Sequence, residues 1–87
     1  MLANLRAAVD DVSNNGGIGA KEAADLDRRV DGLAQQLKRK RGAEATKKIE
    51  EFDKYLTGLT GKGKLTPEGK QQIATALAGV REVADGR

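Results

Sequence analysis

The chain has 87 residues, a formal net charge of +3 and no cysteine, histidine or tryptophan. That length supplies one hydrophobic core, so we expect a single domain over residues 1–87, a module of a larger protein. The missing residue types exclude disulfides, thiolate and imidazole metal ligands and histidine general bases. We therefore expect neither an enzyme nor a cofactor.

The first half of the chain carries two apolar patterns with the three- and four-residue spacing of an amphipathic helix. One pattern predicts a helix over about residues 2–13, which Ser13 and the asparagines and glycines after it would end. The other predicts a helix over about residues 20–41, whose last turn is the basic run Lys38-Arg39-Lys40-Arg41. We expect Gly42 to cap this helix in the left-handed conformation.

The second half of the chain shows the same organisation. A third helix is predicted over about residues 43–60 and ends at the glycines that follow it. A fourth is predicted over about residues 67–85, with Thr66 as its N-cap and Pro67 at its first helical position. The two halves therefore look alike, each with a helix, a glycine turn holding one large apolar residue, and a second helix.

These four helices predict an all-α fold, a compact antiparallel four-helix bundle. Glycine-rich breaks separate the apolar stripes, so one long coiled coil is disfavoured, and no strand pattern competes. Ile18 and Leu65 each lie between a glycine and the next helix, where they would pin the connection to the core. We expect the core to form within a monomer, around Leu26, Val30, Ile49, Phe52 and Leu77.

Residues 11–22 have the length and order of an EF-hand calcium loop. Asp11, Ser13 and Asn15 would supply oxygens at the first, third and fifth positions, and Glu22 would supply a bidentate carboxylate at the last. Only two of these ligands are charged, and the equivalent second loop, residues 58–69, has no carboxylate at its first or last position. An ordinary interhelical turn is therefore favoured, and a calcium-binding helix-loop-helix protein remains the alternative.

Positive charge is concentrated in the middle of the chain, where residues 38–64 hold nine basic and four acidic side chains. Clustered cations of this kind attract phosphates and other anions. Proteins that bind single-stranded nucleic acids add aromatic stacking platforms, but Phe52 and Tyr55 fall on or beside an apolar stripe. We therefore favour an anionic cell-envelope polymer or a protein as partner, with nucleic acid as a second alternative. The candidate binding surface consists of Lys38, Arg39, Lys40, Arg41, Lys47 and Lys48.

The remaining charged residues predict no acid–base site. Asp10 and Asp11 are adjacent and point to different faces of a helix, and Asp25 with Arg29 is interpreted as a solvated ion pair. No stretch approaches the length of a membrane span, and residues 1–13 lack the layout of a secretory signal. We expect the chain to be soluble as it stands.

The order of the apolar residues and of the two glycine turns resembles the small helical accessory domain called FIMAH. The turn Gly63-Lys64-Leu65-Thr66-Pro67-Glu68-Gly69 matches the Gly-x-Leu-Thr-x-x-Gly turn typical of the version at the C-terminus of actinobacterial transmembrane serine/threonine protein kinases. The other residues that carry the resemblance are Leu5, Val9, Gly17, Ile18, Leu26, Val30, Leu37, Gly42, Ala45, Ile49, Phe52, Leu56, Ile73, Leu77 and Val80.

This resemblance implies a non-catalytic interaction or sensor module on the extracellular side of a membrane-anchored kinase, or attached to a secreted enzyme. A cytoplasmic location is the alternative. The nucleotide-binding and catalytic motifs of a kinase are absent, so no kinase activity is expected of these residues. The basic run over residues 38–41 stands where family members are often acidic or neutral, and the resemblance brings no binding residues with it.

Overall fold

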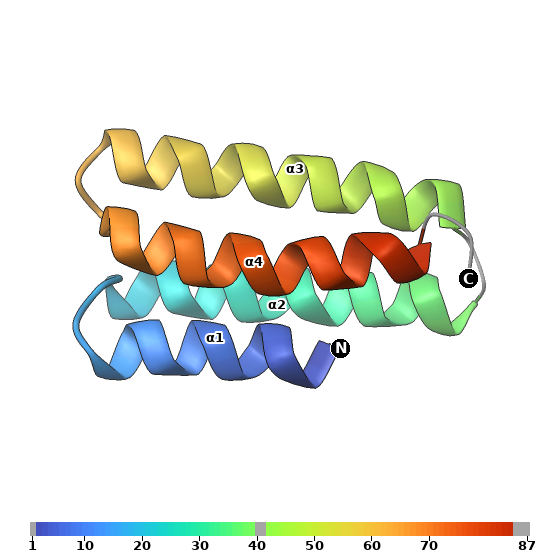
Figure 1. The fold of residues 1–87 in the computed structure, drawn as a ribbon, viewed down its shortest axis with the longest axis horizontal. Coiled ribbons are helices and arrows are strands. Elements are labelled where there is room, and N and C mark those ends of the chain that lie inside the picture. Colours follow the sequence, from blue (N-terminus) through green and yellow to red (C-terminus); the bar gives the residue numbers. More distant parts are fainter. Residues whose placement is uncertain (1, 40–41, 85–87) are drawn as a thin grey trace.

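Four antiparallel helices build the computed structural model, which describes residues 2–39 and 42–84 (Figure 1). Each helix packs against the helices that precede and follow it, and the last closes against the first. This is the up-down-up-down bundle that short connections favour, so the predicted all-α four-helix fold is confirmed. The helices are α1 (Leu2–Asn14), α2 (Ala20–Lys38), α3 (Gly42–Gly61) and α4 (Pro67–Ala84).

Helix boundaries agree with the prediction within one residue except at the end of α2. This helix ends at Lys38, and Arg39 follows as its C-cap with φ −84° and ψ 2°, a conformation that needs no glycine. Gly42 is the first residue of α3, so its predicted role as a left-handed cap is wrong. The predicted helical positions of Lys40, Arg41 and residue 85 lie outside the described residues.

The core is aliphatic around a single aromatic ring. Phe52, on α3, is the largest side chain that is fully buried, and Tyr55 packs at the edge of the core, partly buried. Among the described residues no polar or charged residue is buried, so the interior depends on apolar burial alone. All five residues expected in the core are buried, and the core as a whole comprises Leu5, Ala8, Val9, Val12, Ile18, Ala23, Leu26, Val30, Leu33, Ala45, Ile49, Phe52, Leu56, Leu59, Leu65, Ile73, Leu77 and Val80.

The α1–α2 and α3–α4 connections lie at the same end of the bundle and have the same local structure (Figure 1). Each begins with a glycine in the left-handed region, Gly16 at φ 75° and Gly63 at φ 74°. In both, the residue after this glycine donates its N–H to the carbonyl five residues earlier, at 2.9 Å. These bonds define a Schellman motif, which satisfies carbonyls that the end of a helix leaves free.

The two connections also bind each other. Ile18 and Leu65 form an isolated antiparallel bridge, and the N–H of Thr66 donates to the carbonyl of Gly17 at 2.9 Å. Both apolar side chains are buried, which confirms that they pin the connections to the core. Thr66 also caps α4, since its Oγ1 accepts the N–H of Gly69 at 3.0 Å, as the sequence predicts.

The halves of the chain correspond at an offset of 47 residues. Buried positions match across it, for example Val9 with Leu56, and the left-handed glycines of the two turns, Gly16 and Gly63, match as well. The likeness between the halves is therefore confirmed as a repeated helical hairpin. At the opposite end of the bundle, α2 of the first hairpin meets α3 of the second. This junction occurs once, so it has no counterpart within either half.

Candidate functional site

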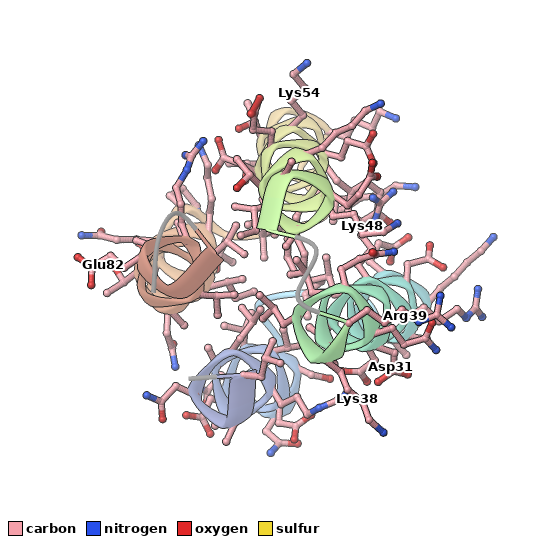
Figure 2. All side chains as sticks on the ribbon, turned by 90° about the vertical axis from the view of Figure 1, so that its right-hand side faces the viewer. Asp31, Lys38, Arg39, Lys48, Lys54 and Glu82 are labelled. Carbon is pink, nitrogen blue, oxygen red and sulfur yellow. The ribbon has the colours of Figure 1, made fainter. Side chains whose placement is uncertain are left out.

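The predicted basic residues gather at the end of the bundle where α2 ends and α3 begins. Lys38, Arg39 and Lys47 are exposed there, and Lys48 is half-buried (Figure 2). Lys40 and Arg41 belong to the same predicted surface and lie outside the described residues.

Two contacts show which edges of α2 face its neighbours. On one edge, Asp31 binds Arg6 of α1. On the other, the stem of Lys48 on α3 lies over Gly32, 4.0 Å from the position that a Cβ would take. Asp31 therefore marks the edge of α2 that faces α1, and the next residue, Gly32, marks the edge that faces α3.

The cations of the predicted surface are divided between these two edges of α2. Seven residues are about two helical turns, so Lys38 shares the α1-facing edge with Asp31, and Arg39 shares the α3-facing edge with Gly32. Figure 2 shows Lys38 on the side of α2 near Asp31, and Lys48 on the side of α3 near α2. Helical periodicity therefore places Arg39 on the edge of α2 that Lys48 covers at Gly32, and Lys38 on the edge of Asp31.

Further along the α2–α3 seam, an arginine stacks on the partly buried tyrosine. The guanidinium carbon of Arg29 lies 4.3 Å from the centre of the Tyr55 ring, within the range of a cation–π contact. The hydroxyl of Tyr55 donates to Asp25 Oδ2 at 3.1 Å, and Arg28 donates to Asp25 Oδ1 at 3.3 Å. The interpretation of Asp25 and Arg29 as an ion pair is therefore wrong, because Asp25 binds Arg28 and Arg29 stacks on the ring.

The surroundings of Tyr55 keep its hydroxyl protonated. Burial raises the pKa of Tyr55 above its ordinary value, and the hydrogen bond to Asp25 and the charge of that carboxylate raise it further. The phenol therefore remains a donor to Asp25 at physiological pH, which fixes the ring under Arg29. Sequence reasoning missed this pair because only the seam between α2 and α3 brings the two residues together.

The EF-hand interpretation of residues 11–22 gains no support from the structure. Helix α1 continues to Asn14 and includes Asp11, whose Oδ2 accepts a hydrogen bond from Gln72 of α4 at 3.4 Å. The carboxylate of Glu22 lies 3.9 Å from Lys64 Nζ. The proposed ligands therefore face different partners, and within the described ranges no group of three or more acidic side chains could hold a metal ion.

Several hollows lie elsewhere on the surface of the described residues, and two of them adjoin the residues of the EF-hand interpretation. A shallow groove of about 390 Å³ runs between α1 and α4, with Asp11 as its one titratable lining residue. A second hollow of about 770 Å³ lies beside the glycine turns, where Glu22 is paired with Lys64. No basic side chain of the described residues lines the first hollow. Over residues 2–39 and 42–84, no helix has the length and apolar character that crossing a bilayer requires.

Comparison with known protein families shows to which family this bundle belongs. A family model for the FIMAH domain matches residues 2–82. The chain belongs to the FIMAH domain family. The match covers all four helices, so the resemblance carried by the apolar spacing and the two turns is confirmed. FIMAH is an accessory domain family and not a catalytic one. No curated protein and no solved structure matches this FIMAH domain.

Proposed function

We propose that this FIMAH domain is a non-catalytic interaction or sensor module on the extracytoplasmic side of a membrane, attached to a membrane-anchored serine/threonine kinase or a secreted enzyme. The observation that carries the proposal is the family match over residues 2–82, because the family is an accessory one. The turn over residues 63–69, typical of the version found in kinases, supports the kind of parent protein.

The contact surface in this proposal is the basic end of the bundle, at the junction of α2 and α3. A cation in the last turn of a helix stabilises the helix dipole, but one or two are enough for that effect. Residues 38–41 supply four in succession, and Lys47 and Lys48 follow in the first turns of α3. This excess favours an anionic partner, and an envelope polymer would be reached directly from an extracytoplasmic position.

Neutralising the four cations of residues 38–41 to glutamine is expected to weaken binding to intact cells of the source organism at least about tenfold. The labelled chain is incubated with the cells at about 50 mM salt, and the bound fraction is measured by sedimentation. The matched control neutralises four lysines at the other end of the bundle, Lys21, Lys62, Lys64 and Lys70.

The control variant is expected to retain most of the binding, because its substitutions leave the α2–α3 end unchanged. Equal losses in the two variants would show that only total charge matters, and unchanged binding of the first variant would make the surface assignment wrong. A chain that does not bind the cell exterior at all would contradict the extracytoplasmic role.

A further inference from the structure

We propose that the FIMAH domain binds one linear phosphodiester polymer without bases, such as a glycerol phosphate chain, along a cationic strip on the α2–α3 seam. The cationic strip is defined as Arg29, Lys48 and Arg39. This inference rests on the proposed function, since it names the ligand class and extends the contact surface along α2. It goes beyond the predicted surface by adding Arg29 and by leaving out Lys38.

The strip is linear and has the length of several phosphate groups. Arg29 lies on α2 and Arg39 is the C-cap of this helix ten residues later, which corresponds to about 15 Å along the helix axis. Lys48 reaches the seam between them, over Gly32. Three cations thus follow one edge of the bundle, a spacing that suits an extended chain with one charge per repeat better than a compact anion.

Two cations of the strip, Arg29 and Lys48, are held in place without being neutralised. Tyr55 supports the guanidinium of Arg29 from one side, which leaves the N–H groups at its rim free for a bidentate phosphate contact. The methylenes of Lys48 rest against the backbone of α2 where Gly32 has no side chain. Within the described part of the chain, none of the three cations forms an ion pair with an acidic residue.

The neighbouring face of α2 would repel the same polymer. Arg6 lies there among Asp31, Asp27 and Asp10, and its pKa is raised first by its hydrogen bond to Asp31 and then by the charges of the three carboxylates. Arg6 and Lys38 stand there against three carboxylates (Figure 2), which leaves this face with a small excess of negative charge. The α3 side of α2 is therefore the more attractive side for a polyanion, even though Asp25 lies at the Tyr55 hydroxyl there.

The aromatic residues favour a polymer without bases over a nucleic acid. Sequence-tolerant binding of single strands uses aromatic faces on which the bases stack. Phe52 is fully buried, and Arg29 covers the ring of the partly buried Tyr55. The strip therefore offers charge without a stacking platform.

The first test inserts a negative charge into the strip without threatening the fold. The Gly32→Glu variant places a carboxylate beside Lys48 where space exists, and Gly79→Glu makes the same change on α4, where nothing lies within 4 Å of a new Cβ. Both substitutions remove a glycine from a helix interior, so neither is expected to unfold the domain. The dissociation constant for a glycerol phosphate chain of about ten repeats, measured by fluorescence anisotropy at about 50 mM salt, should rise about tenfold for Gly32→Glu and less than about twofold for Gly79→Glu.

The second test separates the two edges of α2. Arg29→Gln should weaken binding of the polymer about three- to tenfold, whereas Lys38→Gln, the same loss of charge on the α1-facing edge, should change it less than about twofold. An oligodeoxythymidylate with the same number of phosphates should bind no more tightly than the glycerol phosphate chain. Circular dichroism of each variant confirms that the helices are intact.

The outcomes distinguish this inference from the proposed function. Equal effects of Gly32→Glu and Gly79→Glu, or of Arg29→Gln and Lys38→Gln, would overturn the strip. The proposed function would still stand if neutralising residues 38–41 weakened binding to cells. Tighter binding of the oligodeoxythymidylate, or no binding of the glycerol phosphate chain by the unmodified domain, would overturn the ligand assignment whatever the cell-binding result.

Discussion

The Phe52→Ala variant is expected to retain at most about 2 kcal/mol of stability at 25 °C. Phe52 is fully buried and is the largest side chain of the core. Truncating a buried phenylalanine to alanine typically costs about 3–5 kcal/mol, because transfer free energy is lost and a cavity remains. A domain of this size has a total stability of about 5 kcal/mol, so one substitution removes most of it. Urea denaturation followed by circular dichroism at 222 nm measures the loss.

The matched control is Phe52→Leu, which keeps an apolar side chain at the same position. We expect it to fold, at a cost of at most about 2 kcal/mol, since a leucine fills much of the volume that alanine leaves empty. Tyr55 cannot take over the lost packing, because its hydroxyl is bound to Asp25 and its ring lies under Arg29. An alanine variant within about 1 kcal/mol of the unmodified domain would contradict the central position of this ring.

The same substitution at two glycines of α4 is expected to change stability in opposite directions. A Cβ at Gly69 would lie 2.8 Å from Val12 Cγ1 and 3.0 Å from Thr66 Oγ1, closer than real contacts allow. A Cβ at Gly79 would meet nothing within 4 Å. Gly69→Ala should therefore destabilise the domain by about 1–3 kcal/mol through overpacking. Gly79→Ala should stabilise it by about 0.5–1 kcal/mol, because alanine is the better helix former.

A double-mutant cycle with Val12 tests the cause of the Gly69 effect. If the clash is with the Val12 methyl, Gly69→Ala should cost less in a Val12→Ala background than in the unmodified domain. Chemical denaturation of the four proteins gives the coupling free energy. Additive costs would place the origin of the effect elsewhere, and a stabilising Gly69→Ala would contradict the close packing of the two connections.

The sequence predicts the fold well because the deciding signals are local. The repeated three- and four-residue spacings mark the buried faces, and Thr66 with Pro67 marks the start of α4. The end of α2 is harder to predict, since the C-cap Arg39 has a backbone conformation that is not specific to any residue type. Gly42 looks like a cap but is followed by good helix formers, and it starts the next helix instead.

The candidate site is predicted less completely than the fold. The basic composition of residues 38–48 is visible in the sequence, but the division of Lys38 and Arg39 between two edges depends on which helices flank α2. The stacking of Arg29 on Tyr55 joins residues 26 positions apart, and only the pairing of α2 with α3 brings them into contact. A helical wheel of α2 places Arg29 and Arg39 about a quarter turn apart, and it does not show that α3 lies on that side.

The recognition surface is tested most directly by mapping it residue by residue. Backbone amide shifts of the ¹⁵N-labelled domain are followed by NMR while the glycerol phosphate polymer is added. The account predicts that the shifts concentrate on residues 28–39 of the chain and on 47–55 of α3, with little change in α1 and α4. Shifts centred on the glycine turns or on the groove between α1 and α4, or no shifts at all, would contradict it.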